Sequence, residues 1–223
     1  MPGQPDHRAI DRLPLAWARM LQLVNAALSH ATAVLIERGL VAVTYTSTFD
    51  DLLCALDDEI GTHATLIRTF EDRRVPAVDL CRIVTGAQVS IDAACLGGLA
   101  RSLTDLARSR PAERSWPAEP DGILREMAGD CLTMIATVAA GLNSADTATP
   151  LPLETLQRSR DAVGVSHALL CRRLAALGEN VDVCTSVDLC LAGQCLIRCV
   201  EHIFSTARHL ALMRSATTGG HGP

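Results

Sequence analysis

The stretch Cys195–Met213, CLIRCVEHIFSTARHLALM, decides how the rest of the chain is interpreted. Its apolar residues recur at helical spacing, so the pattern predicts one long helix with a single buried face. The same stretch contains two cysteines, one glutamate and two histidines, so a metal site or a catalytic site has to be weighed as well. Together with one upstream position, the apolar stripe comprises Leu189, Leu196, Val200, Ile203, Ala207 and Leu210.

Composition favours an all-α protein. Of the 223 residues 48% are hydrophobic but only 3% are aromatic, so the core must be built from small and aliphatic side chains at close helix contacts. The net charge is -5, and no basic run is interleaved with aromatic residues. We therefore expect no nucleic-acid partner.

The N-terminal residues 1–12 lack a charged-then-apolar signal pattern, and no window holds the roughly 18 uninterrupted apolar residues that span a bilayer. The sequence therefore predicts a cytoplasmic protein without an integral membrane segment. The nine cysteines are an odd number, lie in apolar helical pattern and include no C-x-x-C pair. We expect reduced thiols without disulfides.

Five further apolar stripes precede the one in the opening stretch. The first three pass through Trp17, Leu21, Val24, Leu28, Ala31 and Leu35, then Phe49, Leu53, Leu56, Ile60, Ala64, Ile67 and Phe70, then Leu80, Val84, Ala87, Ile91, Ala94, Leu99, Leu103 and Leu106. The next two pass through Ile123, Met127, Cys131, Met134, Val138 and Leu142, then Leu156, Val163, Leu170, Leu174 and Leu177. Residues 41–48, VAVTYTST, have strand-like composition, but no partner strand is evident and they are assigned to the start of the second helix.

Three prolines interrupt the pattern in SRPAERSWPAEPDG, residues 109–122, which we interpret as a linker. The predicted organisation is two tandem three-helix bundles, residues 12–108 and 123–214. The halves overlay at an offset of 107 residues. This offset pairs Ala94 with Glu201, Leu80 with Val187, Val84 with Leu191, Leu96 with Ile203, Ala100 with Ala207 and Leu103 with Leu210.

The opening stretch resembles the signature of the PhoU family, phosphate-uptake regulators made of two three-helix bundles. RCVEHIFSTARHLA is similar to Leu-Glu-Arg-Ile-Gly-Asp-His-Ala, with Arg198, Glu201, Ile203 and Ala207 at matching positions. The first half has IDAACLGGLARSL at the corresponding place and keeps Asp92, Gly97, Leu99 and Ala100. VPAVDLCRIV and FDDLLCALDDEI resemble further family segments, so the resemblance covers roughly residues 19–213.

The resemblance implies a cytosolic adaptor, present as a homodimer, that negatively controls phosphate uptake and the phosphate-starvation response. Its partners would be the ATPase subunit of a phosphate ABC transporter and a sensor histidine kinase. Glu201, Arg198 and Asp92 would be what remains of a partner-facing or metal-facing motif. The family's acidic pairs fall here on Glu201 with Ser205 and on Ala94 with Gly98. Only one of the four carboxylates is kept, so no metal or other cofactor is expected.

An alternative reading is a metal or redox protein that uses Cys195, Cys199 and His202. Their spacing of four and three residues places them on one helix face. Small thiols beside an apolar stripe are also ordinary packing residues. His167 and His209 are interpreted as partly buried, hydrogen-bonded residues. No nucleophile elbow and no phosphate-binding loop occurs, so no catalytic residue and no enzymatic activity are predicted.

Overall fold

The computed structural model describes residue 10 and residues 12–36, 46–70, 75–109, 115–143 and 150–218. Within these ranges the chain is helical and contains no strand, which confirms the predicted all-α class. The α-helices are α2 (Leu13–Ile36), α4 (Thr46–Arg68), α5 (Ala77–Ser109), α6 (Ala118–Asn143), α7 (Leu153–Leu177) and α8 (Val183–Thr218). A short 3-10 helix, η1 (Gly178–Asn180), connects α7 to α8.

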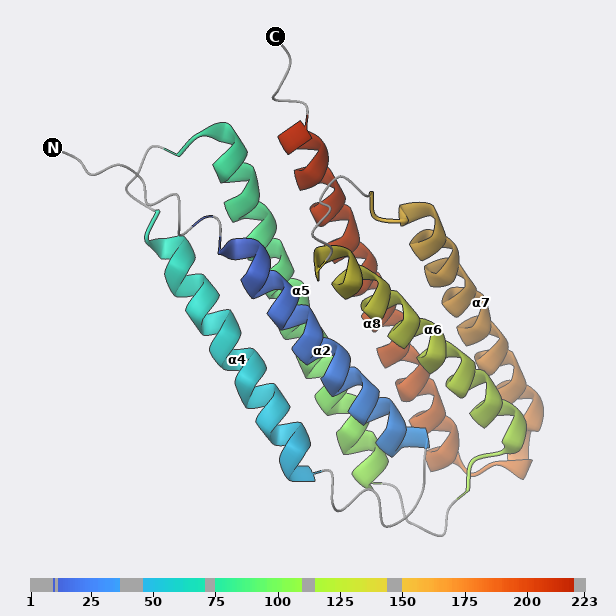
Figure 1. Ribbon diagram of the computed structural model, residues 1–223. Coiled ribbons are helices and arrows are strands. Elements are labelled where there is room, and N and C mark those ends of the chain that lie inside the picture. Colours follow the sequence, from blue (N-terminus) through green and yellow to red (C-terminus); the bar gives the residue numbers. More distant parts are fainter. Residues whose placement is uncertain are drawn as a thin grey trace, which may run out of the picture.

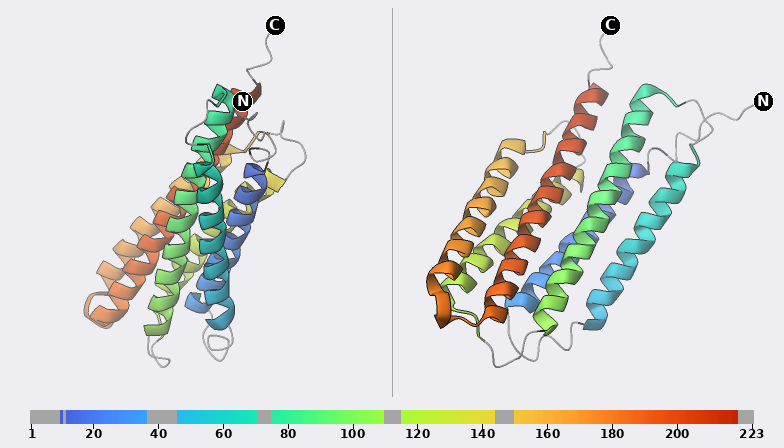
Figure 2. Two further views of the ribbon diagram at one scale, coloured as in Figure 1. Left: turned by 90° about the vertical axis from the view of Figure 1, so that its left-hand side faces the viewer. Right: turned by 180° about the vertical axis from the view of Figure 1, so that it is seen from behind.

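The helices form two three-helix bundles that stand side by side (Figure 1). Helices α2, α4 and α5 make the first bundle, and α6, α7 and α8 make the second. Seen from behind, α7, α8, α5 and α4 form one layer, with α2 and α6 beneath it (Figure 2). Helix α5 packs against α8 and α2 packs against α6, so these four helices join the two bundles.

The two bundles share one continuous core. A single cluster of buried apolar side chains runs from Leu13 in the first helix to Leu210 in the last. All six residues of the first predicted stripe are buried, and so are all six of the stripe in α8. The aliphatic composition explains this arrangement, because small side chains let neighbouring helices approach closely.

Burial supports the predicted duplication. In each of the six residue pairs that the 107-residue offset defines, both members have the same environment. The pairs from Leu96, Ala100 and Leu103 are buried in both halves, and the pairs from Leu80, Val84 and Ala94 are exposed in both. Helices α5 and α8 therefore occupy equivalent positions in the two bundles.

The stripe predicted for the first half of α5 is wrong about which side is buried. Leu80, Val84 and Ile91 are 53%, 54% and 55% exposed, and Ala94 is exposed as well. The buried side of α5 holds small and polar residues instead, among them Asp79, Thr85, Gly86, Ser90 and Asp92. Hydrophobic periodicity selects the most apolar face, and in the first half of α5 that face is turned to solvent, whereas Leu99 and Leu103 of the same stripe are buried.

The predicted linker, residues 109–122, is too long at its C-terminal end. Helix α6 begins at Ala118, inside that segment. Pro117 precedes the helix and Pro120 lies in its first turn, where backbone N–H groups have no helical partner, so proline costs no hydrogen bond. The amide of Asp121 donates to the Pro117 carbonyl at 3.0 Å and so starts the helical ladder.

The strand-like segment falls mainly outside the described residues. Residues 41–45 lie there, as does Gly39, near which the first helix is predicted to end, while Thr46–Thr48 begin α4. Helices α5 and α8 are long and apolar enough to cross a membrane, with 50% and 39% of their most apolar windows buried inside the protein. Core helices of bundles pass the same test, and both of these helices contribute to the shared core.

Candidate functional site

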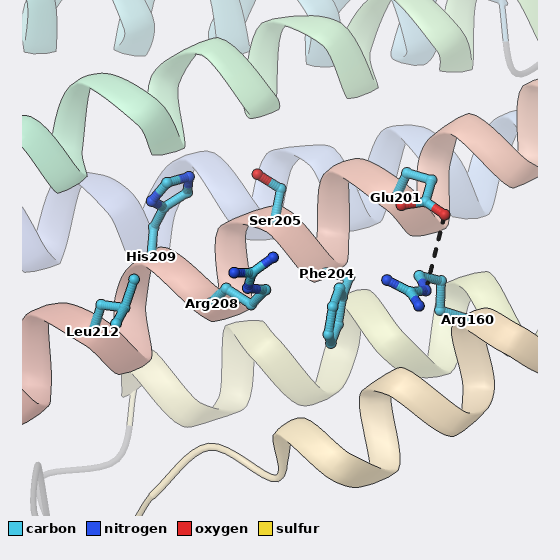
Figure 3. A pocket seen from close by; sticks show the side chains of 7 residues that line it. All are labelled: Arg160, Glu201, Phe204, Ser205, Arg208, His209 and Leu212. Carbon is cyan, nitrogen blue, oxygen red and sulfur yellow. Dashed lines mark ion pairs between the residues drawn. The ribbon is translucent and has the colours of Figure 1, made fainter.

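A shallow pocket between α7 and α8 contains Glu201, the residue that sequence analysis placed in the family motif. Its volume is about 210 Å³, below the 300–1,000 Å³ typical of small-molecule sites. Most of its lining comes from consecutive turns of α8, and α7 contributes one arginine (Figure 3). The lining residues are Arg160, Glu201, Phe204, Ser205, Arg208, His209 and Leu212.

Arg160 is the α7 residue of this pocket, and three contacts position it. Its guanidinium carbon lies 4.6 Å from the centroid of the Phe204 ring, a cation–π geometry. Its Nη2 donates to Asp161 Oδ1 at 2.8 Å. Its Nε is 3.9 Å from Glu201 Oε1, the ion pair drawn in Figure 3. The pocket thus presents a fixed cation beside an apolar ring and a carboxylate.

Glu201 and Arg198 lie on the exposed side of α8. The Glu201 side chain is 58% exposed, so its carboxylate reaches solvent. Sequence spacing suggests Arg198 or Arg208 as its partner, but the ion pair is made with Arg160 of the neighbouring helix. Both motif residues are therefore available to a binding partner.

Asp92 differs from the expectation that it faces a partner or a metal. It is only 6% exposed, and both of its carboxylate oxygens are engaged by α8. His202 Nδ1 is 2.9 Å from Oδ1, and the Thr206 hydroxyl donates to Oδ2 at 3.1 Å. Asp92 is on the buried side of α5, and its contacts hold the two bundles together.

The three residues of the metal or redox alternative have separate surroundings. Cys199 is fully buried, and its pKa is raised well above the usual value by its interaction with the neighbouring Cys131 thiol and by burial. Cys195 is partly buried, and burial raises its pKa too. His202 is bound to Asp92. Among the described residues, no three His, Cys, Asp or Glu side chains are placed to hold a metal ion.

The positions where the family resemblance would place metal ligands do not suit a hard cation. Ala94, Gly98 and Ser205 supply no carboxylate, and Glu201 is paired with a guanidinium. A calcium or magnesium ion requires several oxygen ligands. The donor set in this chain therefore does not fit a metal cluster of that kind.

A broad outer face joins these features. We define the α5/α8 face as the exposed positions along two adjacent helices, which have α4 and α7 on their far sides (Figure 2). The α5/α8 face is apolar near the N-terminal end of each helix and more polar in the region between these two ends. Its members are Leu80, Val84, Ile91, Ala94, Gly98 and Arg101 from α5, and Val187, Leu191, Arg198, Glu201, Arg208 and Leu212 from α8.

Solved structures provide the comparison for this arrangement. The chain is similar to the crystal structure of PhoU from Pseudomonas aeruginosa, with a TM-score of 0.74 and 15% sequence identity, over 95% of this chain and all of that one. This chain has the PhoU fold. The phosphate transport system regulatory protein PhoU from Streptococcus pneumoniae is also similar, with a TM-score of 0.67, 12% identity and coverage of 93% and 95%. No family model and no curated protein matches the sequence.

Within the PhoU fold, the residues of Cys195–Met213 that match the PhoU signature include both buried and exposed positions. Ile203 and Ala207 are core residues, whereas Arg198 and Glu201 are exposed. Sequence analysis missed Arg160 and Phe204 as neighbours of Glu201. The one available signal was Arg160 itself, a charged residue on the apolar face predicted for residues 156–177.

Proposed function

We propose that this chain is a PhoU-like regulatory protein that acts by binding and not by catalysis. The observation that carries the proposal is the similarity to PhoU structures over almost the whole chain, combined with an open α5/α8 face that carries Glu201 and Arg198. Large apolar side chains exposed on adjacent helices are typical of interaction surfaces. The pocket beside this face is too small for a typical metabolite and suits a protein side chain.

The proposed partners are the ATPase subunit of a phosphate ABC transporter and a sensor histidine kinase. Binding would keep the phosphate-starvation response off when phosphate is plentiful and would limit phosphate uptake. The protein would act in the cytoplasm, where both partners expose their soluble domains. The resemblance in Cys195–Met213 and the PhoU structural neighbours support this assignment.

The test is a pull-down of each candidate partner with purified protein, combined with transcription measurements in a deletion strain. Leu191→Asp places a charge on the α5/α8 face at a position 51% exposed and should reduce capture. Val165→Asp is a matched control because Val165 is 67% exposed on α7, away from that face. The proposal fails if neither partner is enriched and deletion leaves phosphate-regulated transcription unchanged.

A homodimer is the second part of the proposal. Several large apolar side chains of α5 and α8 are exposed and take no part in the shared core. Burying them against a second copy of the chain would stabilise an assembly. Light scattering across micromolar concentrations should give the dimer mass. A monomer mass throughout that range would contradict it.

A further inference from the structure

Helices α7 and α8 approach each other closely at Gly193. A Cβ atom at this position would lie 2.8 Å from His167 Cδ2 and 2.9 Å from Leu170 Cδ2, so only glycine fits there without displacing α7. The first bundle has the same close approach between two helices, because a Cβ at Gly86 would lie 2.8 Å from His63 Nε2. In both bundles a histidine on the middle helix occupies the space that a glycine leaves.

The close approach brings two cysteines together one turn away. Cys171 follows His167 by one turn of α7, and its sulfur lies 3.8 Å from His167 Nε2. Cys190 precedes Gly193 by one turn of α8, which places its thiol beside that of Cys171 across the contact between the two helices. Cys171 is exposed and Cys190 is partly buried. An accessible thiol therefore has both a second thiol and an imidazole as direct neighbours.

The environments of the two thiols assign them different roles. Burial raises the pKa of Cys190, and the neighbouring Cys171 raises it further. Cys190 therefore stays protonated at neutral pH. His167 Nε2 lies 3.8 Å from the Cys171 sulfur, and this atom is an acceptor when the neutral imidazole has its hydrogen on Nδ1. The Cys171 side chain is exposed to solvent.

We propose that Cys171 and Cys190 form a peroxide-reactive thiol pair that closes a reversible disulfide between α7 and α8, with His167 as the proton acceptor for Cys171. Neither the proposed binding function nor the α5/α8 face is needed for this inference. It also differs from the metal or redox alternative, which invoked Cys195, Cys199 and His202.

The oxidant in this scheme is a hydroperoxide, and two steps complete the reaction. In the first, the Cys171 thiolate attacks the distal oxygen, the O–O bond breaks, Cys171 becomes a sulfenic acid, and the proton held by His167 passes to the leaving alkoxide or hydroxide. In the second, Cys190 displaces that hydroxyl as water and the S–S bond forms. Two thiols thus lose two electrons and two protons, and the peroxide yields one alcohol, or water, and one further water.

The chain contains a matched internal control. Cys131 and Cys199 are also neighbouring thiols, but both are fully buried and no peroxide can reach them without opening the core. Cys54 is exposed, as Cys171 is, and belongs to α4, on the opposite side of the protein. Among these cysteines, only the Cys171–Cys190 pair combines a neighbouring thiol with an exposed cysteine that a peroxide can reach.

The experiment treats the reduced full chain with hydrogen peroxide, blocks remaining thiols and maps the peptides without reductant. We expect one disulfide linking Cys171 to Cys190, reversed by dithiothreitol. Cys190→Ser should halt the reaction at a Cys171 sulfenic acid that dimedone labels. His167→Gln should slow that labelling by about a hundredfold, the lower end of the range for a lost proton-transfer group. Cys171→Ser should abolish both products.

Three results would overturn the inference. The first is the absence of a Cys171–Cys190 peptide at peroxide concentrations that already oxidise Cys54. The second is a disulfide in the buried Cys131–Cys199 pair that forms as fast. The third is dimedone labelling of Cys171 at an unchanged rate in His167→Gln, which would remove the histidine's role. Circular dichroism of each variant shows whether an altered rate reflects the site or a loss of folding.

Discussion

Asp92 of α5 and His202 of α8 join the two halves of the protein, with 2.9 Å between Oδ1 and Nδ1. Thr206 donates to the other carboxylate oxygen, so α8 satisfies both acceptors of a buried acidic group. Because a buried carboxylate without partners is costly, this contact specifies how the bundles dock as well as contributing to stability. The apolar contacts around it are far less specific in register.

Removing the Asp92 carboxylate should destabilise the fold. We expect Asp92→Ala to lower the free energy of unfolding by about 1–3 kcal/mol, since the hydrogen bonds of His202 and Thr206 to this buried side chain are lost. Each kcal/mol corresponds to roughly 2–4 °C in Tm for a chain of this size. Asp105→Ala on the same helix is the control, because the Asp105 side chain is 63% exposed. Equal effects of the two substitutions on Tm would contradict the role of Asp92.

Glu201→Ala should separate binding from stability. The carboxylate is 58% exposed and 3.9 Å from Arg160, and exposed ion pairs contribute only about 0–1 kcal/mol. Tm should therefore stay close to that of the unmodified chain while capture of the proposed partners weakens. Glu126→Ala, an exposed acidic residue of α6, should change neither quantity. A large loss of Tm in Glu201→Ala would show that this carboxylate is more tightly held than its exposure indicates.

Two glycines of α5 should respond oppositely to alanine. At Gly86 a Cβ would lie 2.8 Å from both His63 Nε2 and Trp17 Nε1, so Gly86→Ala should destabilise by about 1–3 kcal/mol through overpacking. At Gly98 nothing lies within 4 Å, so Gly98→Ala should stabilise by roughly 0.5–1 kcal/mol through helix propensity. Denaturant unfolding of both variants tests the pair. Destabilisation by Gly98→Ala would show that this open surface is occupied in solution.

Acidification should weaken the first bundle through His63. Its Nε2 accepts a hydrogen bond from Trp17 at 3.0 Å, and its Nδ1 is 2.7 Å from the Ser90 hydroxyl. Burial lowers the pKa of His63 from its ordinary value of 6.5, so the folded protein holds it neutral. Below pH 6.5 the unfolded chain binds a proton that the folded chain refuses, and stability falls until the lowered pKa is reached.

Unfolding free energies measured between about pH 7.5 and about pH 5.5, roughly one unit either side of the ordinary histidine pKa, test this effect. His63→Gln should show a shallower loss of stability on acidification, because one group that titrates differently in the two states has been removed. His209→Gln provides the control, since His209 is a histidine of α8 at the surface pocket. Identical pH slopes for His63→Gln and the unmodified chain would disprove the assignment.

Periodicity predicted some elements well and others badly for a physical reason. In α2 most of the strongly apolar positions share one face, so the stripe from Trp17 to Leu35 identified the buried side, although Leu15 is exposed. In α5 the buried side holds Asp79, Ser90 and Asp92, which partner helices satisfy or enclose, and the exposed side holds Leu80 and Val84. A pattern along one helix contains no information about what the neighbouring helices supply.

The sequence by itself determined the helical class, the six helices, the duplication at 107 residues and the resemblance of Cys195–Met213 to PhoU. These follow from local spacing and composition, which act within one helix or between two copies of one pattern. Only the tertiary structure decided that Asp92 is buried against His202, that Glu201 pairs with Arg160, and that Cys171 meets Cys190. Each of those contacts joins different helices, and their relative rotation depends on packing across the whole shared core.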